Sequence, residues 1–141
     1  MTDRPALATS LRLEPHPEGG WFRQTWASPV TVTLQDGRVR PTATLIYFLL
    51  PAGETSAWHR VSSDELWLSH GHGPVIIELG GSGDSPHRHT TSVLGVDLGA
   101  GEFPQVLVPA GEWQRTQRSE DDALVSCLVS PGFDFDDFEL A

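Results

Sequence analysis

Two ionisable residues in the stretch Trp58 to Trp67 have the types and spacing that proton-transfer chemistry needs. His59 and Glu65 lie six positions apart, on two short segments that read as strands. Side chains two positions apart share one face of a strand, so His59 and Val61 point the same way. Burying an ionisable pair is costly unless it is hydrogen-bonded, so such a pair indicates a functional site. A histidine satisfied within the core is the alternative interpretation of the same residues.

Three further side chains are candidates for substrate contacts. Arg23 shares a strand face with Trp21 and Thr25, and a guanidinium facing a pocket can bind a carboxylate or phosphate through two parallel hydrogen bonds. A surface ion pair is equally compatible with Arg23. Tyr47 interrupts an apolar run, where a buried phenol supplies a proton or a structural hydrogen bond. Trp67 shares the face of Glu65 and is predicted to form an apolar pocket wall.

Other reactive side chains favour structural interpretations. Cys127 lies in an apolar strand and lacks basic neighbours, so we expect a buried thiol rather than a nucleophile. The histidines at positions 70, 72, 87 and 89 lie beside glycine-rich loops, where solvated side chains are the rule. The C-terminal stretch FDFDDFEL alternates aromatic and acidic residues. We expect it to be a surface segment, with a pocket role for Asp134 as the minor alternative.

The elements that position these residues are short strands. After a brief N-terminal helix around Ala6 to Leu11, glycine- and proline-rich turns separate apolar segments throughout the chain, a pattern typical of a sandwich or barrel. The predicted strands cover residues 21–27, 30–34, 42–50, 56–61, 65–70, 75–79, 89–94, 105–109, 113–117 and 124–129.

Two segments resemble the paired motifs of the cupins. Gly53, His59 and Glu65 match the first motif, in which Val61 replaces the second histidine, and the stretch from Pro109 to Gln114 matches the second motif with glutamine at its final histidine. The segments PHPEGG, WHRVSSDE and PAGEWQ resemble those of the fifth cupin family, which consists of small single-domain proteins of no established substrate. The resemblance implies an all-β cupin jelly-roll β-barrel over residues 1–141, commonly a homodimer, with a ligand pocket inside.

The resemblance also implies where the site lies and what it holds. His59, Glu65 and Gln114 are expected around one cavity in the barrel. Because two of the four metal-ligand positions of the motif are changed, we predict no bound metal and no other cofactor. A metal-dependent dioxygenase or isomerase using His59, Glu65 and Gln114 is the alternative.

Composition limits the partners. The net charge is −10, with 19 acidic and 9 basic residues and no basic cluster, so nucleic acid is not an expected partner. No segment approaches the roughly 20 apolar residues of a membrane helix, and a single cysteine gives no disulfide, so a cytoplasmic protein is expected. Five tryptophans, together with the resemblance, predict a homodimer that buries aromatic residues.

These observations predict a small-molecule-binding protein, and the leading hypothesis is a metal-independent isomerase, epimerase or dehydratase acting on a small polar or sugar-like metabolite. His59 is the expected general base, kept basic by Glu65. Tyr47 or Gln114 would stabilise an oxyanion, while Arg23 would bind an anionic group. A non-catalytic ligand-binding protein is the other alternative, and here we expect ligand binding without turnover.

Overall fold

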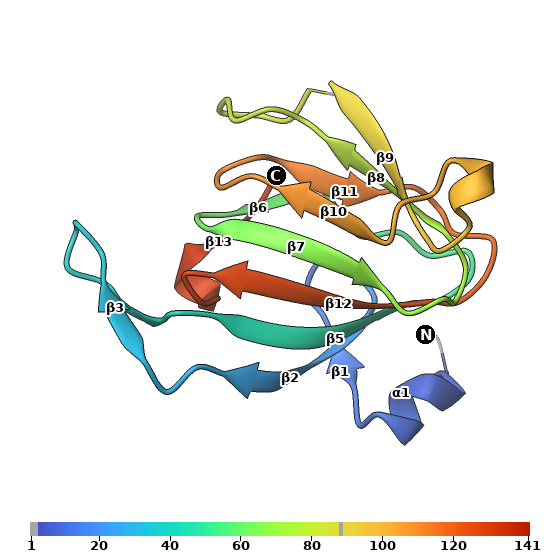
Figure 1. Ribbon diagram of the computed structural model, residues 1–141, viewed down its shortest axis with the longest axis horizontal. Coiled ribbons are helices and arrows are strands. Elements are labelled where there is room, and N and C mark those ends of the chain that lie inside the picture. Colours follow the sequence, from blue (N-terminus) through green and yellow to red (C-terminus); the bar gives the residue numbers. More distant parts are fainter. Residues whose placement is uncertain (1–2, 88) are drawn as a thin grey trace.

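The computed structural model describes residues 3–87 and 89–141, and nearly all of the regular structure in them is antiparallel β-sheet (Figure 1). One short helix, α1 (Ala6–Ser10), precedes the strands, and two 3₁₀ turns, η1 (Leu98–Ala100) and η2 (Phe135–Asp137), interrupt them. The strands are β1 (Glu14–Pro15), β2 (Trp21–Ala27), β3 (Thr31–Thr33), β4 (Val39–Pro41), β5 (Thr44–Leu50), β6 (His59–Val61), β7 (Asp64–Ser69), β8 (Val75–Leu79), β9 (Thr90–Leu94), β10 (Gln105–Val108), β11 (Gln114–Thr116), β12 (Ala123–Ser130) and β13 (Phe138–Leu140).

Two sheets enclose the interior. The six-stranded sheet has the order β1-β2-β5-β12-β7-β10, the five-stranded sheet has the order β13-β6-β11-β8-β9, and β3 and β4 form a separate hairpin. Consecutive strands such as β5, β6 and β7 alternate between the two sheets, as expected when a chain winds into a double-sheet jelly roll. The predicted all-β jelly roll with a short N-terminal helix is therefore confirmed.

Strand periodicity divides the side chains of β5 between two environments. Phe48 and Leu50 point inward into the main core, while Thr44 and Ile46, on the same face, line a cavity at one end of the barrel. The alternate residues point outward: Leu49 packs beneath α1 in a second cluster. Because both faces of β5 are covered, the sequence of this strand is apolar without alternation.

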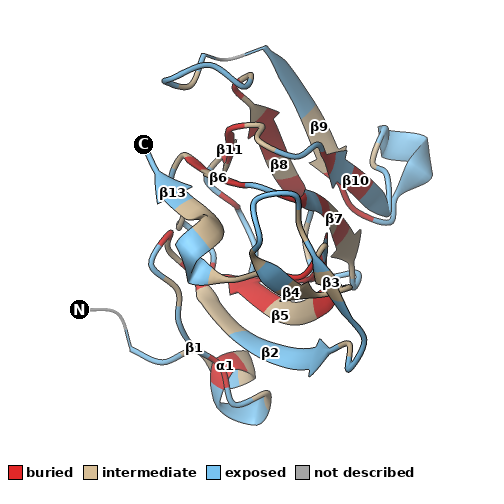
Figure 2. Cartoon of the chain, turned by 90° about the vertical axis from the view of Figure 1, so that its left-hand side faces the viewer, coloured by how far each residue is buried: buried red, intermediate tan, exposed pale blue. Residues whose placement is uncertain are grey.

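The outer face of the six-stranded sheet carries α1. Ala8, Leu13 and Leu49 are completely buried there, and the partly buried side chains of Trp21 and Tyr47 pack against them. Figure 2 shows α1 beneath the edge formed by β1 and β2. This small second core explains why side chains on the outside of the barrel can be apolar.

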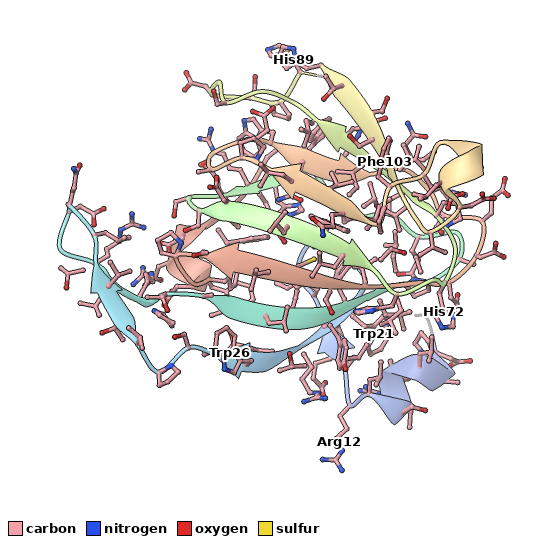
Figure 3. The ribbon with its side chains drawn as sticks, in the orientation of Figure 1. Arg12, Trp21, Trp26, His72, His89 and Phe103 are labelled. Carbon is pink, nitrogen blue, oxygen red and sulfur yellow. The ribbon has the colours of Figure 1, made fainter. Side chains whose placement is uncertain are left out.

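Most of the tryptophans are accounted for within one chain. Trp67 and Trp113 are buried, Trp21 and Trp58 are half-buried, and Trp26 is 47% exposed. Among the tryptophans from which a homodimer was predicted, Trp26 is thus the exposed one, and Phe103 and Phe135 are exposed as well (Figure 3). The homodimer stays a prediction.

The predicted strands agree with the structure except at their ends and at three short elements. Strands β1, β4 and β13 were not predicted, because each has only two or three residues and no alternating pattern of its own. Among the described residues there is no helix long and apolar enough to cross a membrane.

Candidate active site in the barrel

A cavity of about 310 Å³ opens at the end of the barrel where β12 ends and the C-terminal segment begins. Figure 2 views the molecule from this end, at which η2, β13 and the β3–β4 hairpin lie. Its walls come from both sheets and from the segment after β12. The ionisable side chains that line it are those of His16, Glu18, His59, Glu65, Cys127 and Asp134.

The central polar contact of the cavity joins His59 to Glu18. His59 Nε2 lies 2.6 Å from Glu18 Oε2, and both side chains are almost fully buried. The other ring nitrogen of His59, Nδ1, lies 2.8 Å from the carbonyl oxygen of Ala57. A carbonyl oxygen can only accept, so Nδ1 carries a hydrogen. The short contact between His59 Nε2 and the Glu18 carboxyl group therefore contains one further proton, which either group could carry.

Electrostatics assign that proton to His59. Burial on its own would lower the pKa of His59, but the charge of Glu18 and its hydrogen bond outweigh the burial, with a smaller contribution from Glu65, and raise the pKa to about 9. The folded protein at neutral pH therefore holds an imidazolium against the Glu18 carboxylate. Glu18, which the sequence did not identify, raises the pKa of His59 more than the predicted Glu65, whose charge acts in the same direction.

A tight turn between β1 and β2 positions Glu18. Gly19 and Gly20 follow it with φ of +106° and +76°, a region that side-chain-bearing residues rarely adopt. A Cβ atom on Gly19 would lie 2.6 Å from the Thr55 carbonyl oxygen. The turn thus packs directly on the loop before β6, where the Ala57 N–H donates to the Glu18 carbonyl at 2.7 Å. The backbone of Ala57 holds both members of the pair, one through its N–H and one through its C=O.

His16 has a different protonation state from His59. Its Nδ1 accepts the backbone N–H of Glu18 at 3.1 Å, and burial lowers its pKa against the opposing charge of Glu18. The 3.9 Å separation of His16 Nδ1 from Glu18 Oε1 is therefore no ion pair, because that nitrogen is occupied as an acceptor. His16 lines the cavity as a neutral ring.

Glu65 is held from behind by Gln114. The amide Nε2 of Gln114 donates to Glu65 Oε1 at 2.8 Å, and its Oε1 accepts from Trp67 Nε1 at 2.9 Å. This amide ties β11 of one sheet to β7 of the other. Burial raises the pKa of Glu65, and the charge of His59 and the hydrogen bonds from Gln114 and Cys127 offset this only in part. Glu65 is thus suited to carry a proton into the cavity.

The C-terminal segment forms one wall of the cavity, which the sequence did not lead us to expect. Phe133, Asp134, Phe135 and Phe138 all line it, and the ring of Phe138 stacks on His59 with centroids 5.6 Å apart. The prediction of a surface segment is therefore wrong for the three phenylalanines, while Asp134 lies at the cavity, as the alternative prediction allowed.

Three contacts fix this segment. The carboxylate of Asp137 binds the guanidinium groups of Arg38 and Arg40 on the β3–β4 hairpin, with 2.8 Å between Arg40 Nε and Asp137 Oδ2. These hydrogen bonds lower the pKa of Asp137, that from Arg40 most. The Phe133 N–H donates to Thr44 Oγ1, and β13 pairs with β6.

The structure brings together some of the predicted site residues and separates others. His59 and Glu65 line the cavity, whereas Gln114 and Trp67 lie behind its wall and support Glu65. The expectation that Trp67 contacts substrate is wrong, since it is buried in the main core.

Arg23 and Tyr47 do not belong to the site. They are cross-strand partners on β2 and β5, the Arg23 guanidinium lies 5.9 Å from the centre of the Tyr47 ring, and its Nε donates to the Leu11 carbonyl. Both lie on the outer face, because their neighbours Phe22 and Ile46 line the cavity. Strand parity grouped these residues correctly but could not tell the inner face from the outer one.

The remaining reactive groups are Cys127 and the loop histidines. Cys127 is buried, and burial raises the pKa of its thiol, so a nucleophilic thiolate is disfavoured. It does line the cavity beside Glu65. His72 and His89 lie well apart in the view of Figure 3.

The donor set does not fit the ion that metal-dependent cupins hold. Both nitrogens of His59 and both ends of the Gln114 amide are engaged in hydrogen bonds, and Val61 offers no donor. In the described part of the chain, no three His, Cys, Asp or Glu side chains are grouped as metal ligands.

Comparison with known proteins agrees with the fold and the site segments. Residues 5–141 match the family described as Cupin superfamily (DUF985). The chain belongs to this family. The matched region includes the PHPEGG turn, both cupin motifs and the C-terminal segment.

Three relatives illustrate the family. A protein of Shewanella oneidensis with a solved crystal structure is 39% identical, with a TM-score of 0.85 over 100% of this chain and 85% of that one. A hypothetical protein from Leishmania major is 32% identical, with a TM-score of 0.84 over 95% of this chain and 84% of that one. An uncharacterized protein of Saccharomyces cerevisiae is 28% identical over 93% of this chain and 71% of the yeast protein.

The His59–Glu18 pair predicts a pH dependence of stability. Because the pKa of His59 is about 9 when folded and about 6.5 when unfolded, its contribution is complete below pH 6.5 and is lost as the pH rises through 9. The free energy of unfolding should fall by about 3 kcal/mol across this window. Urea denaturation at pH 6, 7.5 and 9 measures it. In His59→Gln the fall should be largely absent, and an equal fall in that variant would contradict the assignment.

The two hydrogen bonds of the Gln114 amide should contribute more to the free energy of unfolding than an ordinary hydrogen bond does. Gln114→Met keeps the length of the side chain but leaves the buried Trp67 N–H and Glu65 without their partner, at a cost of about 2–4 kcal/mol. Gln117→Met is the matched control, since Gln117 donates to Glu78 at a half-buried position nearby and should cost about 1 kcal/mol or less. Chemical denaturation measures the free energy of unfolding of both variants. Equal losses would show that the hydrogen bonds of Gln114 stabilise the fold no more than those of Gln117.

Proposed function

We propose that the protein is an enzyme that takes a proton from a small polar molecule and returns one to the same molecule or to its departing hydroxyl group, as an isomerase, epimerase or dehydratase. The observation that carries the proposal is the His59–Glu18 pair, with 2.6 Å between its atoms, in the wall of a cavity of about 310 Å³. A cavity of this size suits a small metabolite. Buried ionisable groups with perturbed pKa values at a cavity are what acid–base catalysis requires.

The roles follow from the charges of the groups. Glu18 is the base, because it carries the negative charge of the pair and takes a proton from the substrate. His59 is already protonated and both of its N–H groups are engaged, so its positive charge, rather than a direct hydrogen bond, stabilises the negative charge that develops on the substrate. This differs from the role expected from the sequence, in which neutral His59 was the base.

Glu65 supplies the opposite half of the reaction. Its raised pKa makes it the acid, which returns a proton to a second position of the substrate or to a departing hydroxyl group. One proton leaves the substrate and one enters it, so the reaction needs no oxidant or reductant. Exchange of protons between solvent and the two carboxyl groups then restores the starting state.

Isotope exchange tests this function before the substrate is known. Wild-type protein is incubated with a pooled metabolite extract in D₂O, and mass spectrometry identifies any compound that gains deuterium. We expect exchange with wild type and a loss of about 100-fold or more in Glu18→Gln and His59→Gln. Glu139→Gln, which alters an exposed carboxylate on β13, is the control that should retain exchange.

Two results would contradict the proposal. Exchange that survives in both site variants would remove the His59–Glu18 pair from the chemistry. Exchange that disappears with a chelator and returns with a divalent metal would favour the metal-dependent alternative instead.

A further inference from the structure

The charge of the cavity wall constrains the ligand. Three carboxyl groups, those of Glu18, Glu65 and Asp134, line the cavity together with one imidazolium, that of His59. The charges of Glu18 and His59 cancel, and Glu65, as the acid of the proposed reaction, carries a proton, so Asp134 leaves a net negative charge. Among the lining residues in the described chain there is no arginine or lysine. His16 adds no charge, because its Nδ1 accepts a backbone hydrogen bond. An anionic ligand would therefore meet an excess of negative charge.

The nearest arginines cannot compensate. Arg38 and Arg40 are held by Asp137 outside the cavity, and Arg40 also donates to the Val39 carbonyl. Arg23, the cation of β2, lies on the opposite face of the sheet and binds the Leu11 carbonyl. In the part of the chain that the structure describes, no guanidinium of these three arginines is thus free to pair with a carboxylate or phosphate group of a ligand.

Aromatic rings surround the entrance. Phe22, Phe133, Phe135 and Phe138 line the cavity, and Phe135 is 48% exposed despite its place in this cluster. The rings of Phe133 and Phe135 meet edge to face with centroids 4.9 Å apart, and Phe135 and Phe138 do so at 5.8 Å. The half-buried carboxylate of Asp134 lies within the same segment. Phenyl faces beside a carboxylate attract an organic cation.

We propose that the cavity selects a small organic cation, a compact molecule with an ammonium group held by the phenyl rings and by Asp134. This inference rests on the proposed function in that the same cavity is the substrate site. Its ammonium group would lie at the entrance, so that the remainder of the molecule reaches Glu18 and Glu65. The sequence analysis expected Arg23 to bind an anionic group of the ligand. A cavity that excludes anions takes the opposite class of ligand.

Three probes of matched shape and different charge test the proposal: choline, 3,3-dimethylbutan-1-ol and 3,3-dimethylbutanoate. Binding to the wild-type protein at pH 7 is measured by saturation-transfer NMR and calorimetry. Choline should bind about tenfold or more tightly than the uncharged alcohol, since cation–π and carboxylate contacts together exceed about 1.4 kcal/mol. The carboxylate should bind more weakly than the alcohol.

A pair of neighbouring variants locates the effect. Asp134→Asn removes the charge but keeps the Oδ1 atom that accepts the Asp136 N–H, and it should weaken choline about fivefold without changing the alcohol. Asp136→Asn alters an exposed carboxylate that does not line the cavity, and it should leave both affinities unchanged.

The outcomes separate this inference from the proposed function. Equal or tighter binding of the alcohol or the carboxylate, or no binding of any probe, would overturn the cation proposal even if isotope exchange were observed. Preference for choline that is lost equally in both aspartate variants would also overturn it. Choline preference without isotope exchange would leave the cation site standing and remove only the proton-transfer function.

Discussion

The buried ion pair between His59 and Glu18 is the interaction on which the arrangement of the cavity depends. A charged imidazole in a β-barrel interior is stable only if a carboxylate and further hydrogen bonds replace its hydration. Glu18 and the Ala57 carbonyl together provide both. The pair therefore fixes the β1–β2 turn against the loop before β6, and each of these segments takes part in shaping the cavity.

Three separate sets of contacts support the His59–Glu18 pair. The glycines after Glu18 allow a turn that would clash with the Thr55 carbonyl if a side chain were present. Gln114 connects the two sheets and holds Glu65 on the far wall. The C-terminal segment, tied to the β3–β4 hairpin through Asp137, places Phe138 against the His59 ring. Fold and site are thus stabilised by the same contacts, which accounts for polar groups buried so deeply in a small domain.

Most of the fold could be predicted from the sequence, because short strands and glycine turns are local signals. His59 and Glu65 were located through spacing and resemblance. Glu18 was missed, since it lies about forty residues before His59 in the PHPEGG segment, for which no role at the site was predicted, and only the tertiary fold brings them together. Arg23 and Tyr47 were misplaced because strand periodicity gives the same pattern for either face when α1 covers the outer one. The C-terminal phenyl rings were read as surface groups because alternating acids suggest solvent.

The charge state of His59 tests the account most directly. In protein labelled with ¹⁵N-histidine, two-bond ¹H–¹⁵N correlation spectra report whether each ring nitrogen is protonated. We expect His59 to be an imidazolium at pH 7.5, to titrate near pH 9, and to become neutral at pH 7.5 in Glu18→Gln. A neutral His59 in the wild-type protein at pH 7.5, or a titration unchanged by Glu18→Gln, would contradict it.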